Sequence, residues 1–241
     1  MPLAHDNIAK IALAPLLIAQ ALYVRQKALI LPEPPGARSG TTGDGPPLRV
    51  LIAGDSSGAG VGASHQSRAL SGQLATALGR HYRVFWQLEA ATGATTRATL
   101  NRLRTLTEGE FDVAVLALGV NDVTRGVRLK HWVQDHAALA DLLRNRFGVR
   151  RILVSGLPPM GQFPLLPQPL RRILGQTAQR FDTALAAHCA RSPGITHLPF
   201  TLPFRPDYIA RDGFHPSEGA YTLWADMVAG KILSSSGPSS D

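Results

Sequence analysis

The sequence predicts a three-layer α/β domain in which helices cover both faces of a parallel sheet. Short apolar runs alternate along the chain with longer segments of helical spacing, as they do in such folds. The runs are apolar throughout rather than alternating with polar residues, which is typical of strands buried on both faces. With 241 residues, 44% of them hydrophobic, the chain is long enough for one large core.

Each predicted element rests on its own pattern. The clearest strand lies between Asp112 and Gly119, where every residue is apolar. About five strands are expected, at residues 49–53, 84–88, 113–118, 152–154 and 195–198. Helices are expected between and after them, at residues 65–80, 96–106, 129–147, 170–189 and 217–233. Together they make one domain over residues 48–241.

Residues 1–31 form a predicted N-terminal apolar helix. The stretch 11–24 holds 14 residues without a charge, fewer than the roughly 20 that a spanning helix needs, and it contains Pro15. A secretory signal is the alternative, which would make the protein secreted or periplasmic, but Asp6 is atypical of one. We expect instead a helix lying on the domain or on a membrane surface, with Arg25 and Lys27 at its C-terminal end. The protein would then be cytoplasmic or membrane-associated.

Residues 32–47 contain 5 prolines and 4 glycines, and they are predicted to form a linker or surface strap without a packed core. The single cysteine, Cys189, excludes an intramolecular disulfide and any cysteine-rich metal site. The net charge of +8 comes from scattered arginines without a basic stretch interleaved with aromatics, so no nucleic-acid partner is expected. The sequence leaves the oligomeric state open.

Residues able to perform acyl transfer follow the predicted strands. Ligands bind at the carboxyl ends of strands in such sheets. Ser56 follows the first strand and precedes a glycine-rich stretch, where its hydroxyl would be accessible. Asp212 and His215 are three residues apart, so the carboxylate can orient the imidazole while the other ring nitrogen faces Ser56. These three are the candidate catalytic residues.

Two further strand ends supply candidate donors for a negatively charged oxygen. The backbone N–H groups of Ser56 and Gly93 and the side-chain amide of Asn121 would form an oxyanion hole. Asp55 and Asp122 are interpreted as structural, because such carboxylates more often hydrogen-bond loops.

Four segments of the chain resemble, in the same order, the four conserved blocks of the SGNH, or GDSL-type, hydrolases. These segments are Gly54-Asp55-Ser56, Gly93, Gly119-Val120-Asn121-Asp122 and Asp212-Gly213-Phe214-His215. The resemblance implies a flavodoxin-like α/β/α sandwich and a serine esterase without metal or organic cofactor. Ser56 would be the nucleophile, His215 the general base and acid, and Asp212 the third triad member. Ser57 departs from the family pattern, which has leucine after the serine.

The expected activity is hydrolysis of small carboxylic esters with short-to-medium acyl chains. An apolar loop after the fourth strand contributes Met160, Phe163 and Leu165 as candidate substrate-lining residues, and Ser57 is a fourth. Alternatives within the family are carbohydrate O-deacetylase, lysophospholipase and thioesterase.

Alternatives outside the family are weaker. Gly54-x-Ser56-x-Gly58 also fits the nucleophile elbow of α/β-hydrolases, but there the acid and histidine normally come from separate loops. The glycine spacing fits neither a dinucleotide nor a phosphate loop. A lipid- or carbohydrate-binding module is the non-enzyme alternative, although it would be expected to have lost triad residues.

Overall fold

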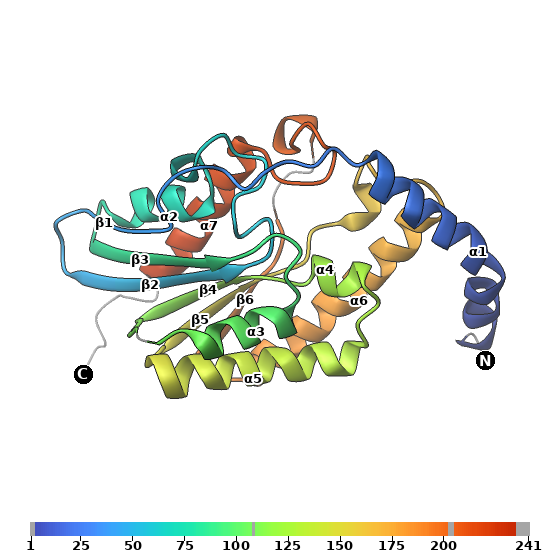
Figure 1. Ribbon diagram of the computed structural model, residues 1–241. Helices are drawn as coiled ribbons and strands as arrows, with labels where there is room; N and C mark the ends of the chain where they lie inside the picture. Colours follow the sequence, from blue (N-terminus) through green and yellow to red (C-terminus); the bar gives the residue numbers. More distant parts are fainter. Residues whose placement is uncertain (1–2, 108, 202–204, 235–241) are drawn as a thin grey trace.

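A six-stranded sheet in the order β1-β3-β2-β4-β5-β6 forms the centre of the computed structural model, which describes residues 3–107, 109–201 and 205–234 (Figure 1). Strands β2 to β6 are mutually parallel and β1 is antiparallel to β3. Their bounds are β1 Ser39–Thr42, β2 Pro47–Gly54, β3 Arg83–Ala90, β4 Val113–Ala117, β5 Arg151–Ser155 and β6 Ile195–Leu198. The predicted five-stranded parallel sheet is confirmed, with one strand added.

The added strand, β1, lies in the segment predicted to be a linker, so that prediction is wrong for Ser39–Thr42. Strand pairing uses backbone N–H and C=O groups, and an edge strand therefore needs no apolar side chains. Gly40 pairs with Trp86 in register, and a Cβ at Gly40 would lie 3.2 Å from the Trp86 indole. The composition of the segment therefore gave no sign of a strand, because β1 is held by its pairing with β3 and not by apolar side chains of its own.

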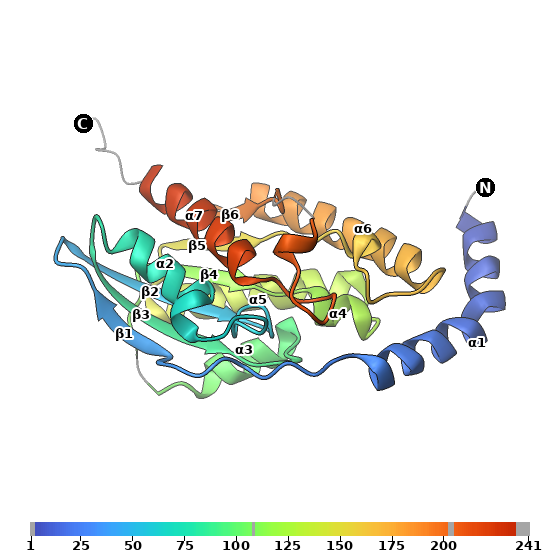
Figure 2. The same ribbon diagram turned by 90° about the horizontal axis from the view of Figure 1, so that it is seen from above.

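Helices cover both faces of the sheet, as predicted (Figure 2). On one face α2 (Leu70–Leu78) and α7 (Glu218–Ser234) bury residues such as Leu74 and Val228 against β2 and β4. On the other face lie α3 (Thr96–Thr105), α5 (Leu129–Phe147) and α6 (Leu170–Ala190), which pack Trp132 and Phe181 into a second core. The two cores hold the sheet and fix its carboxyl edge.

The helix over 129–147 begins and ends at the predicted residues, whereas two other regions differ from prediction. α2 begins at Leu70, not near 65, because residues 66–68 form a 3-10 turn whose N-cap is the His65 side chain. A short helix, α4 (Val120–Thr124), was not predicted. Further 3-10 turns span Met160–Gln162 and Pro206–Tyr208.

The N-terminal helix α1 spans Leu3–Lys27, contains Pro15, and extends away from the sheet in both views (Figures 1 and 2). It is joined to the start of α6 through Gln20, whose Nε2 donates to Gln168 O (2.5 Å) and whose Oε1 accepts from Leu170 N (3.1 Å). Among the described residues, no helix combines the length and apolarity that crossing a membrane requires.

Candidate active site

Ser56, His215 and Asp212 form one chain of hydrogen bonds at the carboxyl edge of the sheet. The Ser56 Oγ lies 2.9 Å from His215 Nε2, and His215 Nδ1 lies 2.5 Å from Asp212 Oδ2. The sequence separates Ser56 from His215 by 159 residues, so only folding brings them together. The three predicted catalytic side chains therefore meet in the arrangement that acyl transfer needs.

Local backbone geometry places His215 beside Ser56. Ser56 follows the end of β2, and Gly62, in the turns that continue from it, has a φ of +103°. A Cβ at Gly62 would lie 2.2 Å from Pro216 O, so only glycine lets the two segments approach this closely. The histidine segment is itself closed by a bridge between Ile209 and Pro216.

Asp212 is held as a carboxylate. Burial alone would raise its pKa, but hydrogen bonds from the His215 ring and from the Phe214 and His215 amides hold the pKa below its usual range. Both amides donate to Oδ1 at 3.0 Å, which leaves Oδ2 for the imidazole. An ionised Asp212 fixes the ring orientation and stabilises a positive charge on it.

Gly93 follows β3 and Asn121 lies in α4 after β4, and a hydrogen bond joins the two loops next to the end of β2. The Asn121 Nδ2 donates to Ala94 O at 3.1 Å, which uses one of its two amide hydrogens. Gly93 has a φ of +78°, and its carbonyl accepts from Arg125 Nη2 at 2.8 Å. Within the described residues, neither the Ser56 nor the Gly93 amide N–H is hydrogen-bonded to the protein. These donors remain available for an oxyanion.

We expect Asn121→Ala to lower kcat by about 10²-fold or more with little change in KM, because the oxyanion exists only in the transition state. Steady-state kinetics on p-nitrophenyl acetate measure both constants. A change confined to KM would remove Asn121 from this role.

Asp55 and Asp122 are both buried and each holds a loop, as their structural interpretation predicts. Asp55 Oδ1 accepts from Ser57 N (2.9 Å) and Ser57 Oγ (2.7 Å), so the residue that departs from the family pattern satisfies a buried carboxylate. Asp122 accepts from Thr96 N and Oγ1, both at 3.0 Å, and so ties α4 to the start of α3.

Burial raises the pKa of Asp122 to about 6, and the charges of Asp55 and Asp135 add to the increase. A raised pKa in the folded protein means that Asp122 stabilises the fold most below pH 3.8, and that this contribution is lost as the pH rises through 6. The shift corresponds to about 3 kcal/mol.

We therefore expect the free energy of unfolding of Asp122→Asn, measured relative to the unsubstituted protein, to increase by about 2 kcal/mol between pH 4 and pH 7. Asparagine keeps an acceptor oxygen for Thr96 but never ionises. Urea unfolding at several pH values measures the difference, and a pH-independent difference would contradict the assignment.

A narrow apolar pocket opens beside Ser56, among residues that follow β4 and β5 and the segment that carries His215. Its volume is about 80 Å³, and its walls include Pro158, Phe163, Phe200, Tyr208, Phe214 and Trp224. The Trp224 Nε1 donates to Ser155 Oγ at 3.0 Å, which satisfies the polar end of that wall. Most of the pocket wall is therefore apolar.

Two of the four predicted substrate-lining residues, Ser57 and Phe163, line this pocket. The prediction is wrong for Met160 and Leu165. Met160 is fully buried in the core between the loop and α6. Leu165 lies behind the catalytic segment, where its N–H donates to Gly213 O at 3.3 Å. An apolar loop residue can face either the core or the pocket, and the sequence alone did not distinguish these directions.

The family of this chain is shown by its sequence match to a known family. Residues 52–223 match the model of the GDSL-like lipase/acylhydrolase family, which is more than half of the chain. The chain belongs to this family. No curated protein matches it. Family membership confirms the resemblance on which the sequence prediction rested.

Solved structures share the fold of this GDSL-like hydrolase. A structure titled TesA has 23% identity and a TM-score of 0.59, with 76% of this chain and 97% of that chain covered. The psychrotrophic esterase EstA from Pseudoalteromonas sp., inhibited by monoethylphosphonate, has 20% identity and a TM-score of 0.57, with 78% and 97% covered. A carbohydrate esterase family 2 enzyme from Corynascus thermopiles has 16% identity and a TM-score of 0.63, with 82% and 69% covered.

Sequence reasoning missed the pocket walls that come from the C-terminal part of this GDSL-like chain. Tyr208, Ile209 and Trp224 line the pocket, and they lie 7, 6 and 9 residues from His215. The first two stand between predicted elements, and Trp224 stands within the predicted helix at residues 217–233, where the pattern did not show that it faces the site. The one available signal was Phe214, which stands inside the Asp212–His215 block and packs edge-on against Phe163, 4.9 Å between ring centroids.

Proposed function

We propose that this chain is a carboxylic ester hydrolase that acts on short-to-medium acyl esters through an acyl-enzyme intermediate on Ser56. One observation carries the proposal. His215 stands between Ser56 Oγ and the ionised Asp212, with 2.9 Å on one side and 2.5 Å on the other.

The geometry supports the following sequence of steps. Ser56 Oγ attacks the ester carbonyl carbon while its proton passes to His215 Nε2. The resulting oxyanion accepts from the amides of Ser56 and Gly93 and from Asn121. When the tetrahedral intermediate collapses, His215 returns the proton to the leaving alcohol and the acyl group stays on Ser56. Water, deprotonated by His215, then releases the acid.

The pocket supports the acyl preference. Its volume of about 80 Å³ is well below the 300–1,000 Å³ typical of sites for drug-sized ligands. Its walls are mainly apolar, so an alkyl chain gains by leaving water there. Acetyl and butyryl esters are therefore expected to react faster than decanoyl esters.

The test is pre-steady-state hydrolysis of p-nitrophenyl acetate. A burst of p-nitrophenol equal to the enzyme concentration, with an acetyl adduct on the Ser56 peptide in the mass spectrum, is expected. An acyl-chain series of p-nitrophenyl esters then tests the pocket. Absence of turnover on every ester and thioester offered would overturn the proposal.

A further inference from the structure

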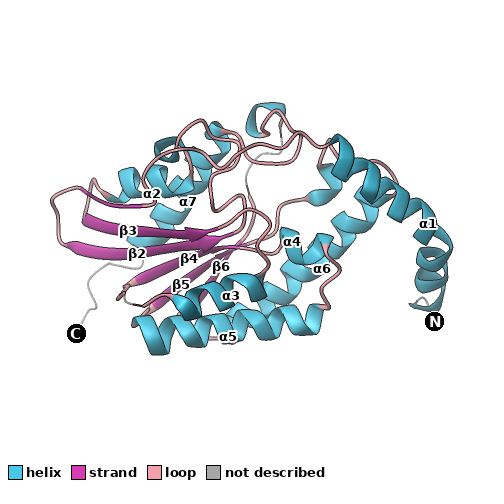
Figure 3. Cartoon of the chain, in the orientation of Figure 1, coloured by secondary structure: helices cyan, strands magenta, loops and turns pink. Residues whose placement is uncertain are grey.

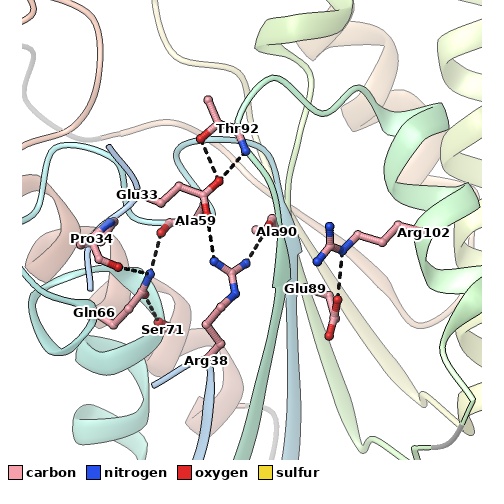
Figure 4. Close-up of polar contacts among 10 residues, drawn as sticks. All are labelled: Glu33, Pro34, Arg38, Ala59, Gln66, Ser71, Glu89, Ala90, Thr92 and Arg102. Atoms are coloured by element: carbon pink, nitrogen blue, oxygen red, sulfur yellow. Dashed lines mark hydrogen bonds and ion pairs between the residues drawn. The ribbon is translucent and has the colours of Figure 1, made fainter. Parts of the chain in front are cut away.

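A segment outside the family match holds the loop that carries Gly93. We call residues 33–38 the strap and residues 91–94 the oxyanion loop. Glu33 Oε1 accepts from Thr92 N at 2.7 Å and from Thr92 Oγ1 at 2.8 Å (Figure 4). Thr92 directly precedes Gly93, so Glu33 fixes the backbone next to the predicted donor.

The strap is itself anchored at both ends (Figure 4). Arg38 donates through Nη1 to Glu33 Oε2 at 3.0 Å and through Nη2 to Ala90 O, so one guanidinium ties the strap to the end of β3. Buried Gln66 donates through Nε2 to Ala59 O at 2.8 Å and to Pro34 O at 3.4 Å. The strap therefore bridges the oxyanion loop and the segment that follows Ser56.

Glu33 is an ionised acceptor. Burial would raise its pKa, but the hydrogen bonds from Thr92 and the positive charge of Arg38 outweigh burial and lower the pKa. Hydrogen bonds to a charged acceptor are about twice as strong as neutral ones. Glycine populates positive and negative φ about equally, so Gly93, at φ +78°, gives the loop backbone freedom that such hydrogen bonds restrict.

We propose that Glu33 is a positioning residue, which holds the oxyanion loop through Thr92 so that the Gly93 N–H meets the oxyanion. This inference rests on the proposed function. Arg125 on Gly93 O and Asn121 on Ala94 O restrain the other side of the same loop. The family match begins at residue 52, so Glu33 is a contribution of this chain beyond the matched region.

The experiment compares Glu33→Ala with Glu110→Ala. Glu110 also pairs with an arginine, Arg49, but it precedes β4 at the opposite edge of the sheet. We expect Glu33→Ala to lower kcat for p-nitrophenyl acetate about tenfold while KM changes less than twofold, because only the transition state loses a well-placed donor. Glu33→Gln, which keeps an acceptor oxygen, should recover part of the loss. Glu110→Ala should change neither constant.

Amide hydrogen exchange gives a readout that does not depend on catalysis. The Thr92 amide should exchange faster in Glu33→Ala than in the unsubstituted protein, and Glu110→Ala should leave it unchanged. Suppose that the unsubstituted protein turns over esters. The positioning role is then wrong, and the proposed function stands, if Glu33→Ala keeps its kcat, changes only its KM, or leaves the Thr92 amide protected from exchange. If the unsubstituted protein turns over no ester, both proposals fall.

A different observation concerns α1, which is apolar on two opposite sides. Leu13, Leu17, Gln20 and Val24 recur at helical spacing on one side; Gln20 is joined to α6, and Val24 packs against the core. On the other side, Ile18 and Leu22 are each 61% exposed. Leu29, two residues after the end of α1, is 48% exposed. A helix that is apolar all round is normally buried or in contact with lipid.

The charges near this face favour a bilayer as its partner. Arg25 and Lys27 are exposed in the last turn of α1. The net charge of +8 also attracts an anionic surface. We propose that the exposed side chains of Ile18 and Leu22 on α1, with Leu29 just after it, insert into the surface of an anionic bilayer, with Arg25 and Lys27 at the head groups.

Vesicle flotation tests this surface. We expect binding to phosphatidylglycerol–phosphatidylcholine vesicles and much weaker binding to phosphatidylcholine alone. Ile18→Ser with Leu22→Ser should lower the partition coefficient at least about tenfold. Arg25→Gln with Lys27→Gln should lower it about thirtyfold, since each basic residue contributes about 1 kcal/mol.

Two controls match these variants. Phe85→Ser alters an exposed apolar residue on β3, and Arg128→Gln with Lys130→Gln removes the same charge at the start of α5; both should bind normally. Absence of flotation, or equal binding to both vesicles, would overturn the proposal. A second result would also overturn it: the unsubstituted protein sediments as a dimer and binds no vesicles, and Ile18→Ser with Leu22→Ser converts the dimer to monomer. A second copy of the chain would then cover this face.

Discussion

Ser56→Ala is expected to lower kcat for p-nitrophenyl acetate by about 10⁶-fold, because Ser56 Oγ is the hydroxyl that lies 2.9 Å from the proposed base, His215 Nε2, and would carry the acyl group. His215 Nε2 would lose the hydroxyl that lies 2.9 Å away, while the oxyanion donors and the pocket would keep their substrate contacts. KM should therefore change little, and the burst and the acetyl adduct should both disappear. Stopped-flow measurement of p-nitrophenol release and mass spectrometry provide these readouts.

The adjacent serine supplies the matched control. Ser57→Ala removes a hydroxyl from the same turn, but that hydroxyl donates to Asp55 at 2.7 Å and not to the histidine. We expect less than a tenfold change in kcat for Ser57→Ala, because the lost hydroxyl bonds Asp55 rather than a reacting group and the Ser57 N–H still donates to Asp55. If Ser57→Ala were as inactive as Ser56→Ala, Ser56 would not be the sole nucleophile.

Asp212→Asn is expected to lower kcat by about 10⁴-fold through the histidine tautomer. The amides of Phe214 and His215 donate to Asp212 Oδ1, so an asparagine would place its oxygen there and turn its NH₂ toward His215 Nδ1. The ring would then accept at Nδ1 and carry its proton on Nε2, where it can no longer take the serine proton. The fold should be retained because the backbone hydrogen bonds persist.

A second aspartate–histidine pair makes the comparison specific. Asp182 Oδ1 lies 2.8 Å from His197 Nε2, and it also accepts from Leu157 N at 2.9 Å, but this pair does not contact Ser56. Asp182→Asn should change kcat less than fivefold, or about 1 kcal/mol. Equal losses in the two variants, or a full recovery of Asp212→Asn kcat at higher pH, would contradict the tautomer argument.

Much of the candidate site could be predicted from the sequence alone, because the candidate catalytic and oxyanion-binding residues occur in short blocks. Asp212 and His215 are three residues apart, and their bonding follows from a local turn closed by Gly213, with a φ of +71°. Ser56, Gly93 and Asn121 each follow a strand, and parallel strands bring their carboxyl ends to one edge. Residue type, order and strand position therefore sufficed to predict these five.

The same reasoning could not predict which apolar loop residues line the pocket or what the strap residues contact. Met160 and Phe163 are neighbours in one apolar loop, yet the first enters the core and the second lines the pocket. Glu33 lies in the segment predicted to be a linker or surface strap, and its proposed role depends on Thr92, 59 residues away. Nothing local in the sequence marks which distant backbone a carboxylate will meet.

The division has a physical cause. The amino-acid pattern was enough to predict the α/β class, the five parallel strands and the identity of the three candidate catalytic residues, because periodicity and short motifs are local features of the chain. Tertiary structure alone decided that β1 joins the sheet edge, that the pocket lies beside Ser56 among residues that follow β4 and β5, and that the strap holds the oxyanion loop. Those features depend on side chains and backbone groups that meet only when distant segments pack together.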